Sequence, residues 1–194
     1  MKILHTADWH LGQTFYEYDR REEHFHFLEW LKQQIKQHEI DVLLIAGDVF
    51  DSPNPSAESQ RVYYRFLREV TSENPSLQIV IIAGNHDSAA RLEAPNPLLE
   101  DMNIIVRGTV RRNAEGDIDL QHFIVPLYTE GKVTAYCLAV PYLRQGDYPS
   151  AENYSKGVQQ LYEQLFNKVK EKGIPVVAMG HLQATGSEIS EDDR

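Results

Sequence analysis

The sequence is poor in cysteine and lacks any long hydrophobic run. Its 194 residues include a single cysteine, Cys137, so no disulfide can form within the chain and we expect a reducing compartment, the cytoplasm. No apolar run is long enough to span a bilayer, so we expect no membrane association. Cys137 lies inside the apolar segment 133–140, which favours a core position over a nucleophilic role.

The sequence also lacks an excess of positive charge. Its formal net charge is −10 at pH 7, which argues against a passive nucleic-acid binder, because such proteins need a basic surface. An enzyme that holds divalent cations is not excluded, since its site needs anionic ligands and the bound cations then meet the phosphate. Composition therefore leaves the function open.

Short apolar runs alternate with amphipathic segments in the first half of the chain. Segments 22–37 and 56–70 carry hydrophobic residues at helical spacing, and Ser56 can cap the second of them. Strand–helix–strand spacing of this kind is typical of βαβ units, so the strands between these helices should be parallel. The expected strands are 2–6, 42–46 and 78–83.

The second half of the chain is richer in expected strands. A helix is expected at 154–172 and a last strand at 175–179. We expect one α/β domain over residues 1–186 and a frayed, polar and acidic tail over 187–194. The strands expected before the helix are 104–107, 109–112, 121–127 and 133–140.

Potential metal ligands follow four of the expected strands directly. In open α/β sheets, ligands collect beyond the carboxyl ends of the strands, so these side chains should converge. Each motif alone would be interpreted as a turn or a structural histidine, but four in order at strand ends favour a metal site. The motifs are Asp8-Trp9-His10, Gly47 to Asp51, Gly84 to Asp87 and Gly180-His181, and the convergent residues are Asp8, His10, Asp48, Asn85, His86 and His181.

These side chains combine carboxylate, imidazole and amide oxygen. That mixture suits Mn²⁺, Fe²⁺ or Zn²⁺ better than Ca²⁺. One carboxylate can bridge two ions about 3.5–4 Å apart, the spacing that clamps a phosphoryl group during in-line displacement. Asp48 is the expected bridge, because its strand should lie between the strands that precede Asp8 and Asn85.

The motifs resemble those of a known superfamily. Calcineurin-like metallophosphoesterases have motifs similar to DWH at 8–10, GDVFD at 47–51, GNHD at 84–87 and GH at 180–181. Within that superfamily, the SbcD-like nucleases of DNA double-strand-break repair are similar to this chain in two further stretches. These are ILHTADWHLGQ at 3–13 and VPYLR at 140–144, so the resemblance covers essentially the whole chain.

The resemblance implies a fold, cofactors and an activity. The implied fold is a layered α/β/β/α sandwich, in which two mixed β-sheets are flanked by helices. The implied cofactors are two divalent metal ions, Mn²⁺ first, with Fe²⁺, Zn²⁺ or Mg²⁺ as alternatives. The implied activity is that of a DNA nuclease subunit, a 3′→5′ double-strand exonuclease and single-strand endonuclease that acts in DNA repair and recombination with an SbcC-type coiled-coil ATPase.

The resemblance also implies roles for individual residues. His86 corresponds to a histidine that faces the phosphate without binding metal and that stabilises charge or protonates the leaving oxygen. Asp51 would orient His86 through its carboxylate. The implied metal ligands are Asp8, His10, Asp48, Asn85 and His181.

The chain departs from the superfamily pattern in one respect. That pattern continues with a Gly-His-x-His motif and a DNA-capping domain, and neither is present here, so we expect the N-terminal nuclease portion of a longer subunit. Two other functions stay open. One is a small-molecule phosphodiesterase or phosphatase with the same ligands, and the other is a non-catalytic scaffold that recruits the ATPase.

Aromatic and basic residues suggest further contacts. Tyr63, Tyr64 and Phe66 exceed what one core-facing stripe needs, which indicates a homodimer through helices. The arginines at 107, 111 and 112 flank expected turns, where contact with phosphate is an alternative to an ordinary surface position.

Overall fold

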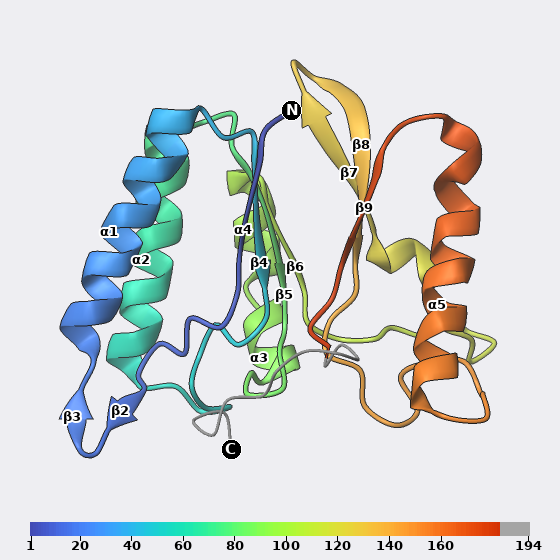
Figure 1. The fold of residues 1–194 in the computed structure, drawn as a ribbon, viewed down its shortest axis with the longest axis horizontal. Helices are drawn as coiled ribbons and strands as arrows, with labels where there is room; N and C mark the ends of the chain where they lie inside the picture. Colours follow the sequence, from blue (N-terminus) through green and yellow to red (C-terminus); the bar gives the residue numbers. More distant parts are fainter. Residues whose placement is uncertain (183–194) are drawn as a thin grey trace.

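The computed structural model describes residues 1–182, which form four layers: helices, a sheet, a second sheet and a helix (Figure 1). The first sheet is parallel throughout, in the order β1-β4-β5-β6, so β4 lies between β1 and β5 as expected. Its strands are β1 (Ile3–Thr6), β4 (Val42–Ala46), β5 (Gln78–Ile82) and β6 (Ile104–Arg107).

The two central strands are apolar along almost their whole length because both of their faces are covered. Side chains alternate between the faces of a strand, so Leu43 and Ile45 pack in the core beneath the helices. Val42 and Leu44 pack against the second sheet. The first sheet therefore stands in the middle of the molecule.

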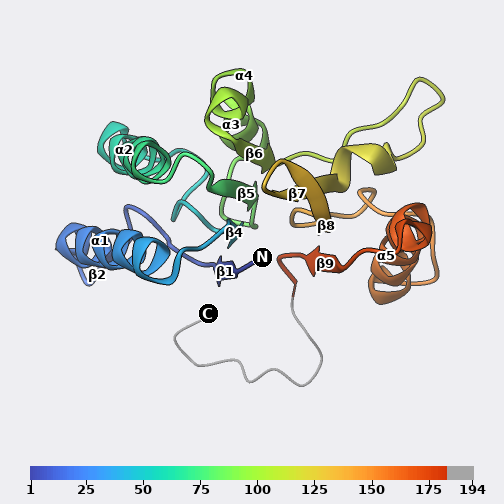
Figure 2. The same ribbon diagram turned by 90° about the horizontal axis from the view of Figure 1, so that it is seen from above.

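Helices α1 (Arg21–His38) and α2 (Ala57–Glu73) cover the outer face of the first sheet (Figure 2). Ser56 caps α2, accepting a hydrogen bond of 3.0 Å from the Ser59 amide. The aromatic side chains Tyr63 and Phe66 of α2 are 0% and 2% exposed. They are thus core residues, and the surplus of aromatics that suggested a dimer on this helix is not found.

The second sheet contains one antiparallel hairpin and one parallel pair. Strands β7 (Ile124–Thr129) and β8 (Lys132–Ala139) form the hairpin, and β9 (Val176–Met179) runs parallel to β8. Helix α5 (Tyr154–Val169) covers its outer face, and the 3₁₀ turn η3 (Lys170–Lys172) follows that helix. The layered α/β/β/α sandwich is confirmed, although only this second sheet is mixed.

One buried side chain joins the two sheets. The Gln78 amide at the start of β5 donates to the Pro126 carbonyl at 2.9 Å and its oxygen accepts from the Tyr128 amide at 3.2 Å. Nearby, the thiol of Cys137 on β8 is fully buried between the sheets, and burial raises its pKa to about 12. The expected core position of Cys137 is confirmed.

The structure differs from the expected elements in one expected strand that is absent and in several short elements that were not expected. Segment 109–112 is not a strand, since it makes one isolated bridge, between Arg112 and Ile118. Within the described residues, no helix is long and apolar enough to cross a membrane. The expected frayed tail, 187–194, lies outside the described residues. The additional elements are β2 (Thr14–Phe15), β3 (Tyr18–Asp19), α3 (Ala89–Glu93), α4 (Asn96–Leu99), η1 (Glu100–Met102) and η2 (Leu120–Phe123).

Candidate metal centre

The loops after β1 and β4 remain paired beyond the ends of their strands. The Asp8 amide donates to the Gly47 carbonyl at 3.1 Å, and the His10 amide donates to the Asp48 carbonyl at 3.0 Å. Asp8, His10 and Asp48 have positive φ angles of 56°, 46° and 48°, a region that non-glycine residues seldom occupy. Such strained positions cost about 1–3 kcal/mol each and cluster at functional sites.

A buried carboxylate, Asp87, holds the loop after β5 against the loop after β4. It accepts hydrogen bonds from the amides of Val49, Phe50 and Gly84 at 3.2, 3.0 and 2.9 Å. Burial raises the pKa of the Asp87 carboxyl, while these three amides act in the opposite direction. Asp87 belongs to the GNHD motif, but sequence reasoning gave it no role, because two of its partners lie 37 and 38 residues away.

Glycine at position 84 allows the two loops to touch. A Cβ there would overlap the carboxylate and the amide nitrogen of Asp48. A Cβ at Gly47, whose φ is 90°, would overlap the His181 ring in the same way. Both glycines are therefore required by close approach of the loops that carry the candidate ligands.

Two groups of three side chains result from this packing. The ligand atoms of Asp8, Asp48 and His181 lie within 4.8 Å of one another. The same holds for His10, Asp51 and His86. Asn85 joins the first group, because its Oδ1 atom lies 3.0 Å from His181 Nε2. The structure thus brings together all seven of the site residues that the sequence suggested.

Asp48 lies between the two groups. Its Oδ2 atom is 3.4 Å from His181 Nε2 and 3.8 Å from His10 Nε2. Burial alone would raise the pKa of the Asp48 carboxyl, but hydrogen bonds from His181 and from the His86 amide hold it below its usual value. The hydrogen bond to Asp48 in turn raises the pKa of His181 to about 9.

The surroundings of His181 require a cation. Its Nδ1 atom donates to the Ala46 carbonyl at 2.8 Å, so in the neutral ring Nε2 offers a lone pair. That lone pair faces the oxygens of Asp48 and Asn85, which are acceptors as well. Three acceptors face one another stably only around a proton or a metal ion, and a metal-binding histidine commonly donates its other N–H to a carbonyl in this way.

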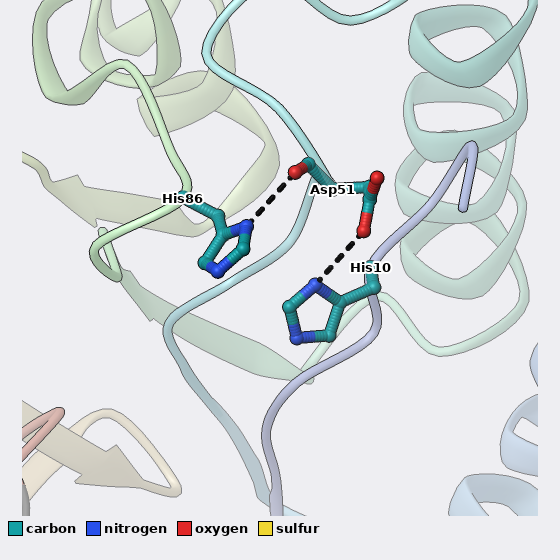
Figure 3. A group of neighbouring side chains, drawn as sticks. All are labelled: His10, Asp51 and His86. Atoms are coloured by element: carbon teal, nitrogen blue, oxygen red, sulfur yellow. Dashed lines mark hydrogen bonds and ion pairs between the residues drawn. The ribbon is translucent and has the colours of Figure 1, made fainter. Parts of the chain in front are cut away.

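The second group is arranged differently from what the resemblance implied (Figure 3). The Asp51 carboxylate faces His10, with 3.4 Å between Oδ1 and His10 Nδ1. His86 contacts Asp51 through the main chain instead, since its Nδ1 atom donates to the Asp51 carbonyl at 2.9 Å. His10 Nδ1 is buried beside the Asp51 carboxylate without a hydrogen bond among residues 1–182, and the other ring nitrogen, Nε2, faces Asp48.

Tyr142 is a neighbour of the site that sequence reasoning did not single out. Its ring meets the His181 ring edge to face, with centroids 6.3 Å apart. Tyr142 lies in the VPYLR stretch, whose resemblance to the nucleases was the signal that could have drawn attention to it.

Comparison with known proteins agrees with this geometry. The family model described as Calcineurin-like phosphoesterase matches residues 1–194. A subunit of the nuclease SbcCD from Rhodobacter capsulatus is 42% identical over 198 residues, which cover 96% of this chain and 49% of that protein. The corresponding SbcCD protein from Escherichia coli K12 is 31% identical, with 98% and 48% covered.

A third SbcCD relative, from Bacillus subtilis, is 29% identical over 100% of this chain and 50% of its own length. The chain therefore spans about half the length of the curated relatives it matches. Proteins of the matched family use divalent metal ions, for which the two groups around Asp48 are candidate sites. Strand-end motifs, parallel sheet, clustered carboxylates and imidazoles, and a match over the full sequence all agree: the chain belongs to the calcineurin-like phosphoesterase family.

Proposed function

We propose that this protein is a metal-dependent DNA nuclease subunit that hydrolyses phosphodiesters at a dinuclear metal centre, as a 3′→5′ double-strand exonuclease and a single-strand endonuclease. The observation that carries the proposal is the position of Asp48 between two groups of ligand atoms. A shared carboxylate is what a pair of ions needs, and two adjacent ions neutralise and clamp a phosphoryl group. The relatives named as parts of a nuclease support DNA as the substrate.

We assign the ligand roles by donor chemistry. Asp48 is the proposed bridge, and a mixed set of carboxylate, imidazole and amide oxygen favours Mn²⁺, with Fe²⁺, Zn²⁺ or Mg²⁺ as alternatives. His181 Nε2 and Asn85 Oδ1 lie 3.0 Å apart, close enough to bind one ion together, which supports a ligand role for both. The proposed ligands are Asp8, His10, Asp48, Asn85 and His181.

His86 is the proposed proton donor. Its ring is exposed. Because Nδ1 donates a hydrogen bond to the Asp51 carbonyl, Nε2 is the ring nitrogen that can contact the substrate. From there it can hydrogen-bond the phosphate and protonate the leaving oxygen. Asp51 acts by fixing the orientation of both histidines, His86 through its carbonyl and His10 through its carboxylate.

We further propose a cytoplasmic location and two protein partners. The relatives carry the name of a two-component nuclease, which supports an SbcC-type coiled-coil ATPase as the first partner. The second is another copy of the chain, paired through helices. Trp30 on α1 is 52% exposed and stacks on Phe27, which supports α1 rather than α2 as the contact. Light scattering on wild type and Trp30→Ala tests this homodimer.

Metal counting and a choice of substrates test the nuclease proposal. The full-length protein is stripped with chelator, reloaded with Mn²⁺ and analysed by mass spectrometry. It is then given linear duplex DNA, a single-stranded oligonucleotide and bis-p-nitrophenyl phosphate. Two ions per chain with metal-dependent cleavage of both DNAs is the expected result.

Other outcomes of the same experiment identify the competing functions. Hydrolysis of the small diester without any cleavage of DNA would mean a small-molecule phosphodiesterase. Two bound ions with no hydrolysis of any substrate, or failure to bind metal at all, would mean a non-catalytic scaffold.

A further inference from the structure

The segment that follows β8 runs between two of the loops that carry candidate ligands. The Tyr142 amide donates to the carbonyl of Ala83, the residue before the Gly84-Asn85 turn, at 2.8 Å. The Val140 amide donates to the carbonyl of Met179, the residue before the Gly180-His181 turn, at 3.2 Å. Leu143 is 1% exposed and anchors the segment in the core beneath α5. The side chains on either side of Leu143 are thus held near each other, with Tyr142 beside His181.

Those two side chains, Tyr142 and Arg144, form a cation–π pair. The carbon at the centre of the Arg144 guanidinium lies 5.6 Å from the centroid of the Tyr142 ring. The ring is half-buried and meets His181 edge to face, whereas Arg144 is exposed. Within residues 1–182, the Arg144 side chain forms no ion pair and no hydrogen bond, so its donors are free.

Three other arginines among the described residues of the second half are already engaged. Arg107 donates to the His122 carbonyl, Arg111 to the Glu93 carboxylate, and Arg112 to the carbonyls of residues 116 and 146. The alternative of phosphate contact for these three arginines therefore loses support. Arg144 differs from them, because it is exposed and lies beside the Tyr142 ring, which meets His181.

We propose that Tyr142 and Arg144 form a nucleotide-binding subsite beside the metal centre. Arg144 binds a phosphate that flanks the one being cut, and Tyr142 stacks against the base of the adjoining nucleotide. Aromatic rings and arginine are the side chains that hold single-stranded nucleic acid, and the ring accepts any base because every base has a π-face. The subsite rests on the proposed nuclease function and specifies how the strand is held.

The subsite also answers a difficulty raised by the charge of the chain. The net charge of −10 has the sign that repels DNA, so affinity must come from local contacts. A bound metal pair, with one guanidinium on the other side of Tyr142, would concentrate positive charge along the proposed path of the strand. Tyr142 contributes stacking, which does not depend on charge.

The test compares substrates in the Mn²⁺-loaded, full-length protein. The ratio of kcat/KM for a single-stranded oligonucleotide to kcat/KM for bis-p-nitrophenyl phosphate measures strand binding, because the small diester has no flanking nucleotide. We expect Tyr142→Leu to lower this ratio about ten-fold, from the lost stacking. Tyr142→Phe keeps the ring and should retain the ratio, since the contact of Tyr142 with His181 is made by the ring.

Salt dependence tests Arg144 separately. Binding of a phosphorothioate oligonucleotide is measured at several salt concentrations. Arg144→Ala should flatten the plot of log affinity against log salt by about 0.7, the value for one phosphate contact on a single strand. Arg144→Lys should restore the slope. Arg68→Ala is the matched control, since Arg68 is exposed on α2 and pairs only weakly, at 3.6 Å, with Glu69.

Two results overturn the proposal, and they are distinguishable. If wild type cleaves DNA but Tyr142→Leu and Arg144→Ala keep its substrate ratio and salt slope, the subsite is wrong while the nuclease function stands. If wild type hydrolyses only the small diester and binds no oligonucleotide, both the subsite and the proposed function are wrong.

Discussion

Two buried carboxylates in this molecule have histidine neighbours, and they differ in what else surrounds them. Asp48 is 3% exposed and lies near His10 and His181. Glu93, on α3, is 7% exposed and lies 3.7 Å from His122 Nε2. By residue type the two clusters are alike, yet only the cluster around Asp48 is a candidate metal site.

The Glu93 cluster is saturated by donors from the protein. Its carboxylate accepts from the Gly108 amide at 3.2 Å and from the Thr109 amide and hydroxyl at 2.8 and 2.7 Å, and it pairs with Arg111. Burial and the nearby Arg107 and Arg111 lower the pKa of His122 to about 4. His122 Nε2 is buried without a hydrogen-bond partner among residues 1–182, but the guanidinium groups of Arg107 and Arg111 beside it disfavour a further cation.

The Asp48 cluster is short of donors. The His86 amide donates to it at 2.9 Å and His181 faces it from Nε2 at 3.4 Å, but its other neighbours include the carboxylate of Asp8 and the acceptor oxygen of Asn85. The pKa of His181 is raised here, whereas that of His122 is lowered. A buried carboxylate–imidazole pair is therefore structural where donors fill it, and a candidate ion site where acceptors outnumber donors.

The largest expected effect comes from Asp48→Asn, which should abolish metal-dependent hydrolysis and remove most of the bound metal. The amide supplies no charge to either ion and cannot bridge them. Hydrolysis and metal content are measured together on the full-length protein. Two retained ions with normal turnover would contradict the proposed bridge.

Substitution His86→Ala should lower turnover by roughly two to four decades, the usual contribution of a positioned acid or base. Metal content should stay near wild type, because His86 is proposed to act on the substrate and not on the ions. Mass spectrometry and steady-state kinetics on the same preparation distinguish the roles. Loss of metal would make His86 a ligand, as its position in one group with His10 and Asp51 would allow.

Substitution Glu93→Gln should destabilise the fold by about 2–3 kcal/mol without changing metal content. The amide of glutamine cannot accept from all the donors that meet at Glu93, and unsatisfied buried donors are costly. The free energy of unfolding is measured in urea. Glu69→Gln, at the partly exposed pair with Lys32, is the control and should cost about 1 kcal/mol or less. Loss of metal in Glu93→Gln would erase the distinction between the clusters.

The smallest effect is a pH dependence assigned to His122. Its pKa is about 4 in the folded protein, against 6.5 when unfolded, so between these values the unfolded chain binds more protons. Stability conferred by the neutral ring is present above pH 6.5 and is lost as the pH falls. From pH 7 to pH 5, wild type should lose about 1–2 kcal/mol more than His122→Gln does. Equal losses in urea unfolding would show that His122 is not held neutral.

Features that depend on local sequence were predictable. Strands 42–46 and 104–107 have the expected bounds, because short apolar runs between turn residues indicate buried strands. The convergence of the first three strand-end motifs followed from parallel order, whereas His181 reaches them from the end of β9 in the second sheet. Hairpin β2–β3 was missed, since its turn residues Tyr16 and Glu17 have positive φ without being glycine or asparagine.

Long-range contacts were not predictable from the sequence. Segment 109–112 has the composition of a strand, but Thr109 and Arg111 turn to Glu93, which lies 16 and 18 residues earlier. The orientation of the Asp51 carboxylate toward His10 likewise depends on how two loops pack. The spacing of hydrophobic residues along the sequence carries no information about contacts between polar side chains of different loops.

The buried thiol between the sheets has a practical consequence for spectroscopy. At a pKa of about 12 and with no exposed surface, Cys137 stays protonated and out of reach of maleimide reagents. Fluorophores can therefore be attached at cysteines introduced on the surface of this chain without first removing the native one. A dye at Arg68→Cys on α2 and another at Lys168→Cys on α5 would report the separation of the two outer layers while DNA or an ATPase is added.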